Sequence, residues 1–333
     1  MPDCIRNAGA SARSGWTHAA DLVTWPRHTR ILENALSAPG SETPSYRLLT
    51  PQDIPGAQRL RELANWNQTD RDWANLLAFE PEGCFGATLG GKLVGTATTT
   101  RYQPAGGAGS FGWIGMVLVD PDARRHGIGS TLLKKCITYL QGRGVETVRL
   151  DATPLGKKVY DQLGFADEYG LERWEGTARK VPGGVYGQWT LSDLGAEDLP
   201  AVAAYDTPIF GAERKSVLEA WRRDWAEMAV VARDAKKRVL GYALARRGMK
   251  FHQIGPVAGV SEAVNEALLM VLLERLSGQK VVVDFVTANA WAAPIAKRCG
   301  LTHQRPFIRM ALGKNTSPGK RETLLAICCP ELG

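Results

Sequence analysis

The chain has 333 residues, with 41 Lys or Arg against 34 Asp or Glu, a formal net charge of +7. This length exceeds what one hydrophobic core usually supports, so more than one domain is expected. The basic residues are spread along the chain without interleaved aromatics, which argues against nucleic-acid binding. The six cysteines form no C-x-x-C and no Cys/His spacing suited to zinc, so no metal site is expected. With no secretory segment and no long apolar run, the sequence predicts a reduced, cytoplasmic protein without membrane contact.

The first elements expected are two helices. Residues 1–45 lack clear periodicity and have balanced charge, which predicts a disordered extension. One helix is expected to begin at Thr50-Pro51 and a second at Thr69. The loop between them is Asn65-Trp66-Asn67-Gln68.

Three strands are expected next. Cys84 to Leu89 and Leu93 to Thr99 flank Gly90-Gly91, a hairpin signal because both turn residues need positive φ. Ile114 to Val119 is an unbroken apolar run that ends at Asp120-Pro121, as expected of a central strand covered on both faces.

The segment after this strand has the composition of an anion-binding loop. Apolar residues at helical spacing begin at Ile128, so the preceding glycines lie at a helix N-terminus, where free N–H groups attract anions. A dinucleotide-binding loop would need a third glycine where Leu132 stands, and a P-loop would need Gly-Lys-Ser/Thr. The plainer alternative is a glycine turn with solvated arginines. The predicted anion-binding segment comprises Arg124, Arg125, His126, Gly127, Ile128, Gly129 and Ser130.

A strand and a short helix follow. Val145 to Leu150 predicts the strand, and Pro154 to Leu163 predicts the helix, which Gly164 closes before Phe165. Tyr160 lies four residues before this Gly-Phe pair.

The rest of the chain repeats this order of elements. Residues 181–185 are rich in Pro and Gly and are expected to be a linker. In the segment 186–313, Ile254-Gly255-Pro256-Val257 echoes Ile114-Gly115-Met116-Val117. The arginines and glycines of the anion-binding segment have no counterpart there, and Ala296 stands where the first unit has a tyrosine. Residues 314–333 are expected to be a tail, although Leu324 to Ile327 could pair or pack.

The element Arg124-Arg125-His126-Gly127-Ile128-Gly129, placed after an apolar strand, resembles the acyl-CoA pyrophosphate loop of the GNAT N-acetyltransferase superfamily. The tyrosine before Gly164-Phe165 and the order of helices and strands are also similar to this superfamily. The resemblance implies an α/β (α+β) fold with two GNAT-like domains of the YitH-like tandem type, each a mixed, mostly antiparallel twisted sheet flanked by helices. Residues 46–180 would be the catalytic domain and residues 186–313 a degenerate one.

The resemblance implies an acetyl-CoA-dependent enzyme that transfers an acetyl group directly to a primary amine in a ternary complex. Tyr160 would protonate the departing CoA thiolate. Asp151 is the first candidate to accept the proton of the amine, with Glu80 or Glu82 acting through water as alternatives. Thr153 stands where many relatives have an asparagine that contacts pantetheine. The residues implied to contact acetyl-CoA are Met116, Val117, Leu118, Val119, Arg124, Arg125, His126, Gly127, Ile128, Gly129, Ser130, Thr153, Gly156, Lys157 and Tyr160.

In GNAT enzymes the loop between the first two helices lines the acceptor pocket, so Trp66, Asn67 and Gln68 are candidates to bind the amine. The second unit of tandem relatives shapes the acceptor side, which adds Tyr205, Asp206, Phe210 and Arg214, although a cap or core role is equally open for each. Two other functions stay open: an acyl-CoA-binding sensor or interaction module without significant turnover, and an acetyltransferase for a protein lysine or N-terminus. The acceptor would be a small-molecule or peptide amine, and both a monomer and a dimer fit the sequence.

Overall fold

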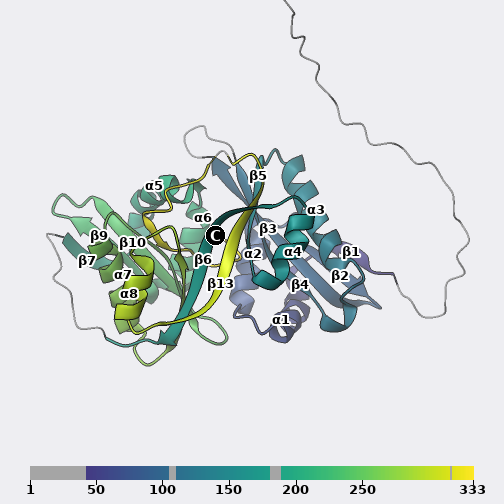
Figure 1. Cartoon of the computed structure of the whole chain (residues 1–333), viewed down its shortest axis with the longest axis horizontal. Coiled ribbons are helices and arrows are strands. Elements are labelled where there is room, and N and C mark those ends of the chain that lie inside the picture. The colour runs from purple at the N-terminus through teal and green to yellow at the C-terminus, as the bar shows by residue number, and fades with distance from the viewer. Residues whose placement is uncertain (1–42, 105–109, 181–188, 316) are drawn as a thin grey trace, which may run out of the picture. The chain divides into compact units, whose positions relative to one another are not determined.

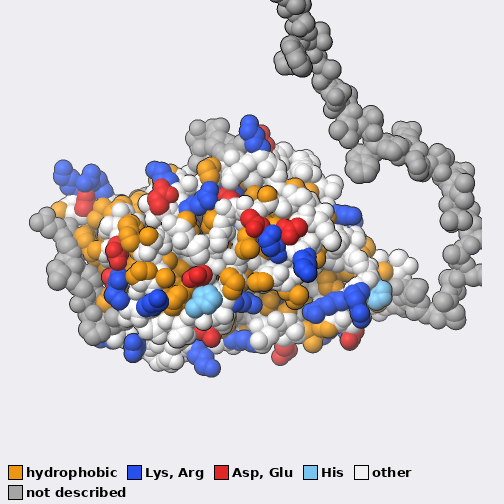
Figure 2. Space-filling model, viewed as in Figure 1, with side chains coloured by type: hydrophobic (Ala, Val, Ile, Leu, Met, Phe, Trp, Pro, Cys, Tyr) orange, Lys and Arg blue, Asp and Glu red, His pale blue; other side chains and the backbone are white. Residues whose placement is uncertain are grey.

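The computed structural model describes residues 43–104, 110–180, 189–315 and 317–333, which belong to one compact unit, Glu42–Gly333. The predicted extension 1–45, apart from residues 43–45, and the predicted linker 181–185 lie outside these ranges. Within them, no helix is long and apolar enough to cross a membrane. On the face shown in Figure 2, Lys and Arg side chains are scattered over both halves with Asp and Glu between them.

The first half follows the predicted order of elements. Thr69 caps α2, since its hydroxyl accepts from the backbone N–H of Asp72 at 3.2 Å while the Asp72 carboxylate accepts from the backbone N–H of Thr69 at 2.7 Å. The predicted hairpin turn is confirmed, because Gly90 and Gly91 have φ of 55° and 76°. The elements are β1 (Ser45–Leu48), α1 (Ile54–Leu63), α2 (Asp70–Phe79), β2 (Phe85–Leu89), β3 (Lys92–Pro104), β4 (Phe111–Val119), α3 (Ile128–Gly142), β5 (Thr147–Ala152), α4 (Pro154–Gln162) and β6 (Ala166–Thr177).

The second half repeats the pattern, which confirms the predicted fold class: a mixed, mostly antiparallel sheet flanked by helices. Its elements are β7 (Trp189–Asp193), α5 (Leu199–Phe210), β8 (Ala212–Glu213), α6 (Lys215–Asp224), β9 (Ala229–Asp234), β10 (Val239–Arg246), β11 (His252–Gly259), α7 (Glu262–Arg275), β12 (Lys280–Val286), α8 (Ala292–Arg298), β13 (Thr302–Gly313) and β14 (Leu324–Ala326).

The two halves exchange strands. The strand order across the junction is β5-β13-β6-β12, so β13 of the second half pairs with β5 of the first, and β6 of the first half pairs with β12 of the second. Figure 1 shows β6 and β13 side by side between α3 and α4 of one half and α7 and α8 of the other. The sheet therefore continues from one half into the other, and neither half has a complete sheet by itself.

A buried ion pair lies at the equivalent place on each exchanged strand. Arg309 on β13 is the register partner of Asp151 on β5, and its Nε and Nη2 donate to the two carboxylate oxygens at 2.8 and 2.9 Å. Arg173 on β6 is the register partner of Asp284 on β12, with both bonds at 2.7 Å. Each aspartate side chain is fully buried, at 0% exposure. Both pairs are planar two-bond contacts, which fix the register of the exchanged strands.

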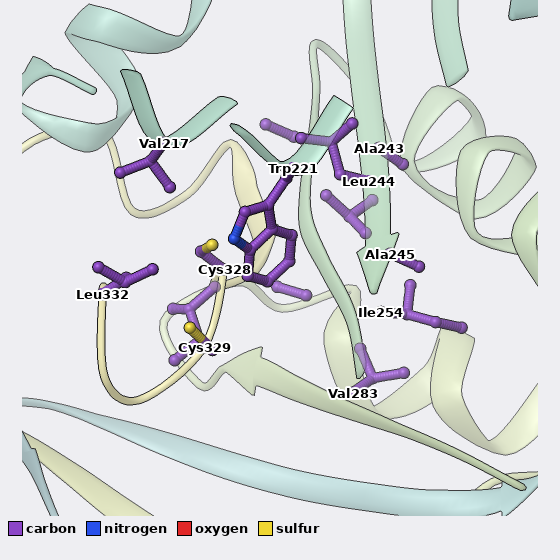
Figure 3. Packing of buried hydrophobic residues seen from close by; sticks show 14 of the residues in the cluster. Val217, Trp221, Ala243, Leu244, Ala245, Ile254, Val283, Cys328, Cys329 and Leu332 are labelled. Carbon is purple, nitrogen blue, oxygen red and sulfur yellow. The ribbon is translucent and has the colours of Figure 1, made fainter. Parts of the chain in front are cut away.

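The prediction of a tail at residues 314–333 is wrong. The strand β14 pairs with both β11 and β12, and Cys328, Cys329 and Leu332 are buried beside Trp221 (Figure 3). The physical reason is the apolar run from Leu324 to Cys329, which is covered on both faces as in other central strands.

Breaking one of these ion pairs should destabilise the whole unit. In Asp284→Asn the Arg173 guanidinium keeps its charge in a buried place without a compensating carboxylate, so the free energy of unfolding should fall by about 3–5 kcal/mol. Urea denaturation measures this change. Glu219→Gln is the matched control, because Glu219 pairs with Lys215 on the surface, where side chains are 46% and 43% exposed. That change should cost under about 0.5 kcal/mol, and an equal cost for both variants would contradict the role of the buried pair.

Candidate active site

The site begins where β4 and β5 diverge. The two strands pair in parallel only from Phe111 to Trp113 and from Thr147 to Arg149. Beyond that point β4 contains a bulge, with Met116 at φ 49° and a register shift against β3. From Ile114 onward the edge of β4 that faces β5 has no strand partner among the described residues, and a slot opens beside Met116 and Val117. The predicted contacts Leu118 and Val119 do not line it.

The predicted anion-binding segment lies at the end of β4. Gly127 is the N-cap of α3 with φ 72°, and a Cβ there would meet no atom within 4 Å, so this glycine leaves open space in front of the helix N-terminus. Arg125 also has positive φ, at 67°. Neither Arg124 nor Arg125 forms an ion pair within the described part of the chain. Both side chains are exposed, and Nε of Arg124 donates to the Val119 carbonyl at 3.4 Å. Ile128, Gly129 and Ser130 form the first turn of α3.

Tyr160 lies on α4 at the other side of the slot. Thr153 caps this helix by accepting from the backbone N–H of Gly156 at 3.3 Å. A Cβ at Gly156 would lie 3.1 Å from the Tyr160 ring, so the glycine makes room for the phenol. Burial raises the pKa of Tyr160 to about 12, and its hydroxyl has no hydrogen-bond partner among the described residues. Lys157 pairs with two aspartates, at 2.8 and 2.9 Å, which reduces the charge that it offers to a phosphate.

A cavity of about 320 Å³ connects this slot with the second half. The structure brings several predicted residues together on its wall: Trp66, Asn67, Gln68, Met116, Val117, Asp151, Thr153 and Tyr160. Gln68 is 6% exposed, and its Oε1 is buried without a hydrogen-bond partner. The opposite wall consists of residues that the sequence analysis did not identify: Arg173, Arg246, Lys250, Phe251, Gln253, Gln304, Arg305, Phe307, Pro330 and Glu331.

Asn67 connects the loop between α1 and α2 with the loop that contains Lys250 and Phe251. Its Oδ1 accepts from the backbone N–H groups of Lys250 and Phe251 at 2.9 and 3.2 Å, and its Nδ2 donates to the Phe251 carbonyl at 3.0 Å. These three bonds hold the 250–251 loop, so Asn67 positions this loop.

Glu331 reaches the cavity from the segment that follows β14. This segment packs against β4 at Gly115, where a Cβ would lie only 2.7 Å from the Glu331 carbonyl oxygen. The indole of Trp113 donates to the Pro330 carbonyl at 3.0 Å and holds the segment in place. One oxygen of the Glu331 carboxylate accepts from Arg246 at 2.9 Å, while the other has no partner within the ranges that the structure describes. A carboxylate oxygen is therefore free beside β4.

The three acidic residues predicted as bases each accept a hydrogen bond from an arginine. Both carboxylate oxygens of Asp151 accept from Arg309, and burial raises the pKa of Asp151 although Arg309 opposes this shift. Glu80 bonds Arg101 and Tyr139, and Glu82 bonds Arg143; neither glutamate lines the cavity. Asp151 is better explained as part of the strand junction, since Asp284 makes the same contact in the other half.

None of Tyr205, Asp206, Phe210 and Arg214 lines the cavity. Arg214 forms a buried ion pair with Asp206 at 2.8 Å, and Tyr205 donates to the Leu240 carbonyl at 3.0 Å. Phe210 packs with Tyr102 and Phe111 at ring distances of 4.9 and 5.2 Å. Asp206 and Arg214 thus form a buried pair within the second half, and Phe210 packs on residues of the first half, as the core alternative implies.

Comparisons with known proteins agree with this geometry. Residues 52–165 match the acetyltransferase (GNAT) family model, and residues 202–326 match an acetyltransferase (GNAT) domain model. The chain belongs to the tandem GNAT acetyltransferases. A putative acetyltransferase from Pyrococcus horikoshii has the same fold, with a TM-score of 0.73 and 24% identity over 92% of this chain and 100% of that chain. A tandem GNAT protein from the clavulanic acid biosynthesis pathway has a TM-score of 0.59 and 15% identity over 81% of this chain and 98% of that chain.

Two curated relatives match parts of this tandem GNAT protein. The uncharacterized N-acetyltransferase YitH of Bacillus subtilis is 26% identical over 156 residues, which is 45% of this chain and 52% of the relative. A mycothiol acetyltransferase of Acidimicrobium ferrooxidans is 30% identical over 203 residues, which is 50% of this chain and 64% of the relative. The chain thus spans about half to two thirds of the length of these relatives.

Gly127→Asp should abolish CoA binding, because a carboxylate would occupy the open space where phosphates are expected to approach the α3 N-terminus. The free energy of unfolding should change by less than about 1 kcal/mol, since the added Cβ meets no neighbour and Asp tolerates positive φ better than most residues. Calorimetric titration with CoA measures the affinity. Unchanged affinity in a folded variant would exclude this segment as the phosphate site.

Proposed function

We propose that this protein is an acetyl-CoA-dependent N-acetyltransferase that acetylates a primary amine in a ternary complex. One observation carries the proposal. A phenol, Tyr160, and a carboxylate with a free oxygen, Glu331, line the same cavity, and this cavity opens beside the unpaired edge of β4. A proton donor and a proton acceptor in one partly buried space are what acyl transfer from a thioester to an ammonium requires.

The residues around the slot fit acetyl-CoA, which the GNAT family generally uses. The open space at Gly127 suits its phosphates, as do Arg124 and Arg125, which have no carboxylate partner among the described residues. The divergence of β4 from β5 leaves room for an extended arm. When bound, acetyl-CoA supplies a thioester activated toward attack by an amine. The free edge of β4 near Met116 offers backbone N–H groups to a carbonyl oxygen, which stabilise developing negative charge.

Tyr160 is the proposed proton donor to the leaving thiolate. Because its pKa is about 12, it stays protonated at neutral pH, and its hydroxyl has no competing partner among the described residues. Glu331 is the proposed proton acceptor in place of Asp151. One of its oxygens is fixed by Arg246, so the other can take the proton of an ammonium without the side chain having to be ordered first.

The cavity favours a small acceptor over a polypeptide. A volume of about 320 Å³ lies at the lower end of small-molecule pockets. The aromatic side chains of Phe251 and Phe307, from the second half, form part of its wall. The mycothiol acetyltransferase relative supports a small-molecule acceptor as well, although its similarity covers only half of this chain.

A screen of amines tests the proposal and separates it from a sensor that only binds acyl-CoA. Thiol release shows turnover, and the intact mass of the product shows an added acetyl group. Tight CoA binding with no acetylated product from any amine class would favour the sensor.

Tyr160→Phe removes the proposed acid and keeps the ring that packs on Phe165. The value of kcat should fall by about ten- to a thousandfold, with little change in CoA affinity. The ratio of wild-type to variant kcat should stay constant between about pH 6 and 10, because a phenol with a raised pKa does not titrate in this range. A ratio that collapses by pH 9 would show that Tyr160 titrates there and would contradict its assignment.

Glu331→Gln removes the proposed base, while Arg246 keeps its second partner Asp72 at 2.9 Å. At neutral pH the value of kcat/KM should fall by about a hundred- to a thousandfold. The deficit should shrink as the pH rises, because a growing fraction of the amine then arrives already deprotonated. Glu322→Gln, an exposed carboxylate before the same strand, is the control and should keep full activity. A deficit independent of pH would make Glu331 a structural residue.

A further inference from the structure

Four cationic side chains line the cavity, and the protein neutralises two of them. Arg173 pairs with Asp284 through two bonds of 2.7 Å. Arg246 pairs with Asp72 and Glu331, each at 2.9 Å. Nε of Arg246 is buried without a hydrogen-bond acceptor, but the charges of both arginines are compensated by carboxylates of the protein.

The other two cations, Arg305 and Lys250, have no carboxylate partner in the described ranges. The guanidinium of Arg305 stacks on Phe307 at 4.7 Å, and its Nε is buried without a hydrogen-bond acceptor. A buried donor without a partner is unfavourable, and few native donors are left in this state unless a ligand or water serves them. Burial and the neighbouring Arg173 also lower the pKa of Arg305, so its positive charge is poorly compensated by the protein.

The strand register places Arg305 next to another positive charge, which is energetically unfavourable. A register shift between His303 and Arg305 on β13 places Arg305 directly opposite Arg173 on β6. Like charges directly opposite each other on neighbouring strands destabilise a sheet. Asp284 accepts hydrogen bonds from Arg173 and Gln253 and none from Arg305, so an added anion at Arg305 would relieve both the repulsion and the unpaired donor.

Lys250 lines the same cavity, and the hydrogen bonds of Asn67 fix its backbone there. Its backbone N–H is fixed by the Asn67 side chain, while its ammonium is exposed and has no hydrogen-bond or ion-pair partner within the part of the chain that the structure describes. A loop held in this way keeps a flexible side chain close to the mouth of the site.

We propose that the acceptor of this enzyme is a primary amine that also carries an anionic group, a carboxylate or a phosphate, and that Arg305 and Lys250 bind this group. The proposal rests on the proposed acetyltransferase function. In this arrangement the ammonium of the acceptor lies toward Glu331 and Tyr160, and its anionic group lies toward the two unpaired cations. One site thus recognises both charges of the acceptor.

Matched amines test the proposal. Glycine, β-alanine and lysine are each compared with the corresponding amide, and phosphoethanolamine is compared with ethanolamine. The acid forms should bind and react about 10- to 100-fold better than the neutral forms, as expected for a charge-assisted contact. The carboxylate and phosphate pairs show which anionic group is preferred.

Variants link this preference to the two cations. In Arg305→Gln and Lys250→Gln the acid-to-amide ratio of kcat/KM should collapse toward the ratio set by the intrinsic reactivity of the amines, while CoA affinity stays unchanged. Arg247→Gln is the matched control, because Arg247 lies in the same loop, pairs with Glu227 and does not line the cavity. It should keep the wild-type ratio.

Binding of the same amines to the CoA-loaded protein, measured by calorimetric titration, gives a readout that does not need turnover. Acid forms that bind without being acetylated would support the anionic site and would contradict the proposed enzyme function. Equal binding of acid and amide, preference for the amide, or binding of neither form would overturn the inference, and acetylated product from neutral amines would leave the enzyme function in place.

Discussion

The pair of Arg–Asp contacts at the strand junction is the constraint on which the rest of the structure depends. Arg309 with Asp151, and Arg173 with Asp284, each join a strand of one half to a strand of the other, in register and away from water. Each arginine lies nine residues after the glycine that closes the preceding helix, Gly164 or Gly300. Such buried pairs contribute more to register than to net stability, because desolvation offsets much of the attraction. Their main effect is that β6 and β13 have only one way to lie between β5 and β12.

The cavity is a consequence of this exchange. Arg173 comes from β6, and Arg305 and Phe307 come from β13, so the two exchanged strands themselves contribute part of the wall. The loop with Lys250 and Phe251 is fixed by Asn67 from the first half. A separated first half would keep the loop for phosphates and the tyrosine, yet it would lack the wall that we assign to the acceptor. Both halves therefore contribute to the cavity: Tyr160 comes from the first half, and Glu331 and Arg305 come from the second.

The parts of the site that sequence predicts best are those formed by local order. The Gly127 turn, Tyr160 on its short helix and the Trp66–Gln68 loop all lie where the order of elements places them, because each needs only its neighbours in the chain. Residues brought in by long-range pairing were missed or misassigned. Nothing local shows that Glu331 reaches Gly115, or that Asp206 and Arg214 neutralise each other in the core. The only feature of the sequence that indicates packing of the C-terminal segment is the apolar run that begins at Leu324, and it predicts only that this segment could pair or pack.

Both halves contain two parallel strands that pair briefly and then diverge, and in the second half a further strand fills the gap between them. In the first half β4 and β5 pair over three residues and then diverge, and in the second half β11 and β12 do the same from His252 to Ile254. There β14 fills the opening, pairing with β11 at Val257 and with β12 at Phe285, and a Cβ at Gly255 would lie 1.9 Å from the Ile327 carbonyl oxygen. In the described part of the second half, β14 therefore occupies the gap between β11 and β12, and the segment that follows β11 lacks the arginines and glycines of residues 124–129. The segment that closes this slot continues directly to Pro330 and Glu331, so the chain that fills the slot of the second half also delivers the proposed base to the first. One segment thus closes the gap between β11 and β12 and contributes Pro330 and Glu331 to the cavity of the first half.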